Sequence, residues 1–258
     1  MAKVETERRG QLLVVRINRP EARNAVDAET AGLLETAVNE FKHDKGLMVM
    51  VLSGSGDVSF CAGADLKSAR GLIERKGADK SGPMGFSRIT DIGKPTIAAV
   101  NGYCLAGGLE LACWCDFRIA AAGAKFGVVN RRWGVPLIDG GTQRLPRIVG
   151  LGNALYLIES GAMINAEQAL RMGLIQEVVP DGTALDRAVE LAGRIAEYPW
   201  TSLINDRRAA YDGLALDLPR GIRQEKEIHA EFFRDVEMFE GLERFKQGRR
   251  PAPPTPPA

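Results

Sequence analysis

Short apolar runs alternate with a helical pattern in the first part of this 258-residue chain. Leu12–Ile17 (LLVVRI) and Leu47–Leu52 (LMVMVL) are bounded by glycine, proline and asparagine, as expected for buried strands. Between them, Leu34, Val38 and Phe41 recur at spacings of four and three, which is typical of one face of a helix. A strand, helix, strand order favours parallel pairing and therefore predicts an α/β fold.

The same alternation continues along the chain. Pro95–Val100 (PTIAAV) and Phe117–Ala121 are the next expected strands, with a helical run between them. Val178–Pro180 is expected to close this region, and from Ala184 onward the pattern is almost wholly helical. Asp27 is the expected N-cap of the first helix, because its carboxylate can accept the unpaired backbone N–H groups there.

The C-terminal part of the chain contains two further features. In its helical part, the apolar residues Ile228, Phe232, Val236 and Phe239 repeat at spacings of four, four and three, so they must pack on the chain's own core or on a partner chain. Proline-rich 251–258 (PAPPTPPA) cannot form a helix and is expected to be a disordered extension, with a PxxP ligand as the alternative. The predicted organisation is a core over 1–195, a helical region over 196–250 and a tail over 251–258.

Charge and histidine content exclude several functions. The 34 Lys and Arg residues nearly balance the 33 Asp and Glu residues, so the net charge of +1 provides no general field for nucleic acid or an anionic membrane. An anionic ligand must therefore be held locally. His43 and His229 are far apart in polar, helix-like stretches, which argues against a histidine triad or a zinc site.

The cysteines and the N-terminal sequence indicate in which cellular compartment the protein is expected. Cys113 and Cys115 are spaced wrongly for a zinc knuckle or a redox pair, and Cys61 and Cys104 also have apolar neighbours. Met1–Gly10 is charged, and no apolar run approaches the roughly 20 residues of a membrane span. We therefore expect a cytoplasmic protein with reduced thiols and no membrane partner.

Two glycine-containing segments are the candidates for chemistry: Ser59–Lys67 (SFCAGADLK) and Asn101–Leu111 (NGYCLAGGLEL). Glycine at the start of a helix lets a ligand approach unpaired backbone N–H groups, which favour negative charge and can form an oxyanion hole. The alternative is that they form only a tight turn and a close packing contact. Neither segment fits a phosphate-binding GxxxxGK[ST] or GxGxxG pattern. The polar stretch that follows, Lys67–Pro83, is expected to be a mobile helix or loop beside the bound ligand.

Four segments, in order and spacing, resemble the enoyl-CoA hydratase/isomerase family, the crotonases. They are Asn18–Asn24 (NRPEARN), Cys61–Leu66 (CAGADL), Asn101–Glu110 (NGYCLAGGLE) and Gly140–Pro146 (GGTQRLP). The resemblance runs from about Gln11 to Arg250. It implies a spiral of ββα units, a helical C-terminal region that builds homotrimers or hexamers, and an acyl-CoA thioester substrate. CoA is then part of the substrate, and no separate cofactor is expected.

The resemblance also assigns site residues. Ala64 and Gly107 match the two positions whose backbone N–H groups bind the thioester oxygen, and Glu110 matches the first of two glutamates that position or activate water. A glutamate in the first turn of a helix is stabilised by the helix dipole whether or not it is catalytic. The implied substrate-binding residues are Ala62, Gly63, Asp65, Leu66 and Gly108, together with Lys67 and Arg23, which could meet the adenine or phosphates or else be solvated surface charges.

Asn130 departs from the hydratase pattern, because it stands where the second glutamate is expected. An amide can hydrogen-bond but cannot exchange a proton at neutral pH. Asp139, nine residues on, could supply the missing acid, or could be a turn residue before Gly140. Trp133 and Arg132 could line the acyl pocket or have only packing and surface roles.

The resemblance implies a hydro-lyase, an enoyl-CoA hydratase that adds water syn across 2-enoyl-CoA in fatty-acid or related acyl-CoA metabolism. Because of Asn130, double-bond isomerisation, decarboxylation, hydrolysis and dehalogenation on the same fold stay open as alternatives. A non-catalytic acyl-CoA-binding protein is the alternative of another class. RNA binding through a lysine-rich helix is disfavoured, because Asp27–Phe41 contains no Lys or Arg.

Overall fold

The computed structural model describes residues 2–230 and 236–248, and the chain divides into two compact units after Gly193. Phe232 and the proline-rich tail, for which predictions were made above, lie outside the described residues. Each unit is described separately below.

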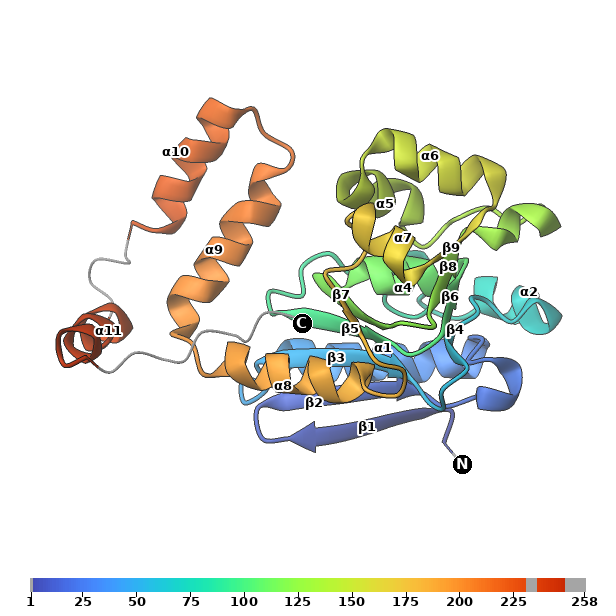
Figure 1. The fold of residues 1–258 in the computed structure, drawn as a ribbon, viewed down its shortest axis with the longest axis horizontal. Coiled ribbons are helices and arrows are strands. Elements are labelled where there is room, and N and C mark those ends of the chain that lie inside the picture. Colours follow the sequence, from blue (N-terminus) through green and yellow to red (C-terminus); the bar gives the residue numbers. More distant parts are fainter. Residues whose placement is uncertain (1, 231–235, 249–258) are drawn as a thin grey trace. The chain divides into compact units, whose positions relative to one another are not determined.

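The first unit contains a six-stranded sheet in the order β1-β2-β3-β5-β7-β10 (Figure 1). Its edge strand β1 is antiparallel to β2, and all the other neighbours are parallel. The central parallel strands β3 and β5 are mostly apolar and are buried along their whole length, as is typical of a sheet covered on both faces. The strands are β1 Val4–Arg9, β2 Leu12–Ile17, β3 Val49–Gly54, β5 Thr96–Val100, β7 Phe117–Ala121 and β10 Glu177–Val179.

A second sheet has the order β4-β6-β8-β9, with strands of only three residues. Strands β4, β6 and β8 are parallel, so their carboxyl ends meet at one edge, and β9 is antiparallel to β8. The strands are β4 Ser59–Cys61, β6 Tyr103–Leu105, β8 Lys125–Gly127 and β9 Met163–Asn165.

The chain alternates between the two sheets. Each of the pairs β3 and β4, β5 and β6, and β7 and β8 contributes its first strand to the larger sheet and its second to the smaller one, before helical segments follow. This is the repeated ββα arrangement that the resemblance implied. The helical segments are η2 Leu66–Ser68, α2 Ala69–Ile73 and α3 Ala78–Ser81 after β4; α4 Gly107–Trp114 after β6; and η3 Val129–Trp133, α5 Gly141–Val149 and α6 Leu151–Ser160 after β8.

The predicted first helix is confirmed as α1, Ala28–His43, between β2 and β3. The Asp27 carboxylate accepts the Thr30 N–H at 2.8 Å and caps it, and Leu34, Val38 and Phe41 are fully buried. Strands β2 and β7 have the predicted bounds. Strand β3 begins two residues later than predicted, at Val49, because pairing with β2 starts there. The remaining elements of this part are η1 Pro20–Ala22 and α7 Ala166–Arg171.

The four cysteines are buried and free, as expected. Burial raises the pKa of the Cys61 thiol to about 12 and that of Cys113 to about 11. These thiols therefore stay protonated near neutral pH, and they serve as small apolar groups in the core.

The second unit is helical, as predicted, and α9 contacts both α10 and α11. Val236 and Phe239 are exposed on α11. That this region builds an oligomer stays a prediction. Within the described residues, no helix is both long and apolar enough to cross a membrane. Helix α8 spans Ala184–Ala196, and the later helices are α9 Trp200–Gly213, α10 Leu218–Ile228 and α11 Val236–Lys246.

Candidate active site

A cavity of about 390 Å³ lies at the carboxyl edge of the smaller sheet. Each of three consecutive loops lines it: Ala64 follows β4, Gly107 follows β6 and Asn130 follows β8. Ligand sites commonly form at the carboxyl ends of parallel strands, where the loops converge. Most of the other lining residues are apolar, including Leu72 and Met84.

The loop after β4 is fixed to the segment before α1. Val26 donates its N–H to the Gly63 carbonyl at 2.9 Å and accepts the Asp65 N–H at 2.8 Å, which forms a parallel bridge opposite Ala64. Because N–H groups alternate in direction along an extended segment, the Ala64 N–H is directed away from Val26. Within the described part of the chain, this N–H has no hydrogen-bond acceptor.

Helix α4 supplies a second free N–H. Ala106, which precedes it, has a φ of +51°, a conformation that costs energy for a residue with a side chain and is common at functional sites. Gly107 follows as the first helical residue, and its N–H also lacks an acceptor among the described residues. A Cβ built on Gly107 would lie 3.5 Å from the Ala64 nitrogen, so the two donors are neighbours.

Glu110 lies in the first turn of α4 and is almost fully buried. Its Oε1 accepts the Gly141 N–H at 2.7 Å and the Asp139 N–H at 2.9 Å, while no residue in the described ranges hydrogen-bonds to Oε2. Burial raises the pKa of Glu110 to about 7, the nearby Asp139 carboxylate adds to this effect, and the two N–H donors oppose it. A carboxylate of this pKa can exchange protons near neutral pH.

Asp139 lies in the same cavity wall and is also buried. Its Oδ1 accepts the Met84 N–H at 3.1 Å and a short hydrogen bond from the Ser87 hydroxyl, and its Oδ2 has no partner among the residues that the structure describes. Burial raises the pKa of Asp139, although Ser87 and Met84 oppose the rise by stabilising the carboxylate. Asp139 therefore precedes the Gly140–Gly141 turn with its carboxylate buried in the cavity wall.

Asn130 is buried and lines the cavity from η3. Its Nδ2 donates to the Val135 carbonyl at 2.7 Å, and its Oδ1 is without a partner in the described part of the chain. An unpaired buried acceptor is costly unless a water or ligand supplies a donor. The amide is therefore positioned to bind a group inside the cavity.

The structure brings most of the predicted residues to this cavity. Its lining includes the predicted residues Ala62, Ala64, Leu66, Gly107, Glu110, Asn130, Trp133 and Asp139. The others lie outside the lining: Gly63 is buried in the loop after β4, Gly108 is buried in the first turn of α4, Arg23 packs over the Tyr103 ring, Asp65 pairs with Arg19, and Lys67 is exposed.

Sequence reasoning missed three contributors. Arg19 binds the Asp65 side chain, Ser87 binds the Asp139 carboxylate, and Ala106 adopts the unusual backbone conformation before α4. Arg19 lies inside the quoted Asn18–Asn24 segment, so that motif was the available signal. Ala106 likewise lies inside the quoted Asn101–Glu110 segment, whereas Ser87 had no signal, because it acts through a contact that no spacing expresses.

Comparison with known proteins identifies the family. The enoyl-CoA hydratase/isomerase family model matches residues 7–253. The chain is 38% identical over 246 residues to crotonyl-CoA hydratase of Syntrophomonas wolfei, covering 95% of each protein, and 35% identical to short-chain-enoyl-CoA hydratase of Clostridium acetobutylicum, covering 95% of this chain and 94% of the relative. The crystal structure of enoyl-CoA hydratase EchA1 from Mycobacterium marinum superimposes with a TM-score of 0.89 at 33% identity, covering 97% of this chain and 98% of the other.

The chain therefore belongs to the enoyl-CoA hydratase/isomerase family and is an enzyme. The predicted family and the predicted α/β fold are both confirmed.

Proposed function

We propose that this enzyme adds water across the double bond of a 2-enoyl-CoA thioester, as the names of its relatives suggest. One observation carries the proposal: two carboxylates, Glu110 and Asp139, line one cavity with two free backbone N–H groups. In each carboxylate, one oxygen accepts hydrogen bonds from protein donors, and the other is available to a reactant.

In the proposed reaction, the thioester oxygen accepts the Ala64 and Gly107 N–H groups. Water adds its oxygen to C3 and gives a proton to Glu110, while the electrons of the double bond move toward the thioester and form an enolate. Asp139 then gives a proton to C2, and solvent restores both carboxyl groups. The two N–H donors stabilise the enolate more than the neutral carbonyl, which lowers the barrier.

Asn130 fits this scheme as a hydrogen-bonding residue. Its Oδ1 can accept a hydrogen bond from the attacking water, although an amide cannot receive the proton. This leaves Glu110 and Asp139 as the proton carriers. Adding water neither oxidises nor reduces the substrate, so the proposed reaction requires no redox cofactor, and CoA enters as part of the substrate.

We also propose that the enzyme works in the cytoplasm. The four buried, free cysteines support this, since reducing compartments keep thiols unpaired.

The direct test is loss of the conjugated enoyl-thioester absorbance when the purified protein meets crotonyl-CoA and longer 2-enoyl-CoA esters. Hydration predicts saturable absorbance loss and a 3-hydroxyacyl-CoA product by mass spectrometry. Binding of these esters without turnover at any chain length would contradict the proposal and favour the non-catalytic acyl-CoA-binding alternative.

The presence of Asn130 in place of a second glutamate favours double-bond isomerisation as a second candidate reaction. Moving a proton between C4 and C2 requires no water to be activated, so a site without the second glutamate can perform it. Supplying a 3-enoyl-CoA separates the two reactions. Appearance of conjugated absorbance without a hydroxylated product would assign isomerisation.

Replacing Asp139 by asparagine is expected to lower kcat by about 100- to 10,000-fold, the usual contribution of a general acid. The amide keeps an acceptor for Ser87 and Met84 but cannot supply a proton. Steady-state kinetics on the best 2-enoyl-CoA measures the change. Asp91→Asn is the matched control, because Asp91 is exposed and pairs with Lys42 on the surface. Wild-type turnover in Asp139→Asn would show that Asp139 is not the proton donor.

A further inference from the structure

We propose that Arg19 is a positioning residue that fixes the direction of the Ala64 N–H toward the thioester oxygen. The proposal rests on the proposed function, in which this N–H binds that oxygen. Arg19 does not line the cavity and acts through the segments that hold Ala64.

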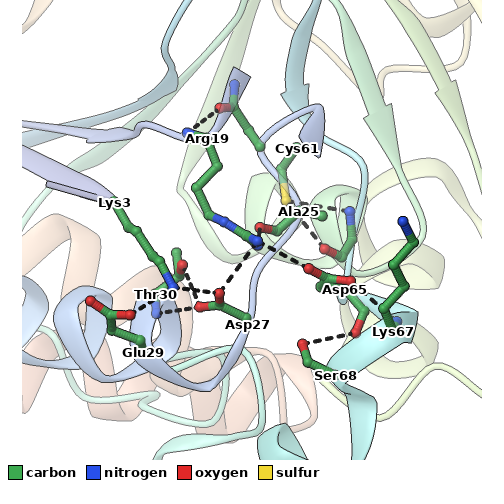
Figure 2. A network of polar contacts seen from close by, with 12 residues as sticks. Lys3, Arg19, Ala25, Asp27, Glu29, Thr30, Cys61, Asp65, Lys67 and Ser68 are labelled. Carbon is green, nitrogen blue, oxygen red and sulfur yellow. Dashed lines mark hydrogen bonds and ion pairs between the residues drawn. The ribbon is translucent and has the colours of Figure 1, made fainter. Parts of the chain in front are cut away.

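The Arg19 side chain joins the two segments of the bridge, as Figure 2 shows. Its Nη1 donates to the Ala25 carbonyl, immediately before Val26, and its Nη2 lies 3.0 Å from the Asp65 carboxylate, immediately after Ala64. The same Nη2 lies 3.3 Å from Asp27, the N-cap of α1. One guanidinium therefore ties both sides of the Val26–Ala64 bridge to the start of a helix.

The contacts are sheltered from solvent, which makes them stronger than surface pairs. The side chains of Arg19, Asp65 and Asp27 are 13%, 18% and 14% exposed. Burial opposes the ionisation of Asp27, but Lys3, Thr30 and Arg19 outweigh it and lower the pKa to about 2. Arg19 is the cation that the Asp27 and Asp65 carboxylates share.

Arginine is required by the geometry. Its planar group donates in several fixed directions, so it can hold a backbone carbonyl and two carboxylates at once, whereas the lysine ammonium is a compact charge on a flexible stem. The backbone of Arg19 is also fixed, because its N–H donates to Asn24 Oδ1 at 2.9 Å and Asn24 is fully buried. The loop thus presents Arg19 in one orientation.

Without Arg19, the loop after β4 keeps its backbone pairing with Val26 but loses the restraint on Asp65. A displacement of about 1 Å of a group that meets the reacting atoms can lower a rate by about 100-fold. We therefore expect Arg19→Met to lower kcat by about 100-fold while KM changes by less than about threefold. Arg19→Lys should recover about one tenth of the wild-type kcat, because the charge is kept and the planar geometry is lost.

The decisive measurement is the absorption wavelength of a bound acyl-CoA probe. The push–pull chromophore 4-(dimethylamino)cinnamoyl-CoA absorbs at longer wavelength when its thioester oxygen accepts strong hydrogen bonds. With the probe saturating, bound wild-type protein should give a red shift, and Arg19→Met should give about half that shift or less, since one of two donors is misplaced. A purely structural role for Arg19 would leave the shift of each bound molecule unchanged.

Arg8→Met is the matched control. Arg8 also holds one carboxylate, Asp44, and one backbone carbonyl, that of Gly10, but its side chain is half exposed and these residues do not line the cavity. Its kcat and probe shift should equal those of the wild type. If Arg19→Met does not fold, Asp65→Asn replaces it, because asparagine can still cap the Lys67 N–H while the ion pair is lost.

The outcomes separate the two proposals. A full red shift and normal kcat in Arg19→Met and Asp65→Asn would overturn the positioning role. Equal effects of the two single variants and of their double variant would support it, since the two side chains would act as one unit. Wild-type protein that binds the probe without any red shift would instead overturn the proposed thioester site itself.

Discussion

Replacing Glu110 by glutamine is expected to lower kcat by about 100- to 10,000-fold with little change in the affinity for acyl-CoA. Glutamine has the same shape and keeps a carbonyl oxygen for the Gly141 and Asp139 N–H groups, so the loop that carries Asp139 should stay in place. Only the capacity to take a proton is lost. Steady-state kinetics and equilibrium binding of a saturated acyl-CoA measure the two effects separately.

The same variant should change how stability depends on pH. The pKa of Glu110 is raised from 4.5 in the unfolded chain to about 7 in the fold, so its protonated form is the one that the fold favours. Its contribution to stability is complete below the unfolded pKa and is lost as the pH rises through about 7, a difference of about 3 kcal/mol. Glu110→Gln removes this loss, so its unfolding free energy above pH 7 should exceed that of the wild type.

Urea denaturation at about pH 5 and about pH 8 tests this linkage, and Glu167→Gln, in an exposed ion pair on α7, provides the control. Glu167→Gln should keep the wild-type pH dependence. The interpretation of Glu110 as a buried proton carrier would be wrong if Glu110→Gln kept full activity, or if it were equally destabilised at both pH values.

Replacing Gly108 by alanine is expected to lower kcat/KM by about 100- to 1,000-fold, the cost of losing one oxyanion donor. A Cβ at this position would lie 2.0 Å from the Cys61 carbonyl oxygen and 2.9 Å from the Cys61 Cβ. Because no atom can stay at these distances, the start of α4 must move away from the loop after β4. That movement separates the Gly107 and Ala64 donors, which converge on one oxygen in the proposed reaction.

The strain should also cost about 1–3 kcal/mol of unfolding free energy, measured by urea denaturation. Gly152→Ala in α6 is the matched control, because a Cβ there meets nothing within 4 Å. That variant should be fully active and as stable as the wild type or slightly more so. Normal kcat/KM in a folded Gly108→Ala protein would show that the close approach of α4 to Cys61 does not position the donors.

Several elements of the fold were predictable because local sequence determines them. Asp27 caps α1 as predicted, and β2 and β7 have their predicted bounds, since both are apolar runs that end at turn residues. The smaller sheet was not predicted. Its strands have three residues each, too few for any periodicity, and they form only because neighbouring repeats supply their partners. Strand β1 (VETERR) is mostly charged, and its position at the edge of the sheet explains why.

The site was predictable only where a motif carried it. Ala64, Gly107 and Glu110 were placed by resemblance, and the structure brings them to one cavity. Arg19 and Asp65 lie 46 residues apart, and a pairing of charges over such a distance leaves no sequence pattern. The positive φ of Ala106 could not be predicted from the sequence either, because an alanine residue gives no indication of a strained backbone.

The three loops that line the cavity contribute different kinds of groups to it. In the proposed reaction, those after β4 and β6 contribute the Ala64 and Gly107 N–H groups, and Glu110 contributes its side chain from the helix that follows β6. The loop after β8 and the segment leading to α5 act through the side chains of Asn130 and Asp139. Under this proposal, substitutions of Asn130 or Asp139 change the groups that contact water and protons while the two backbone N–H donors stay in place. A protein with this fold can thus acquire a new reaction on the same class of substrate without first losing the ability to bind that substrate.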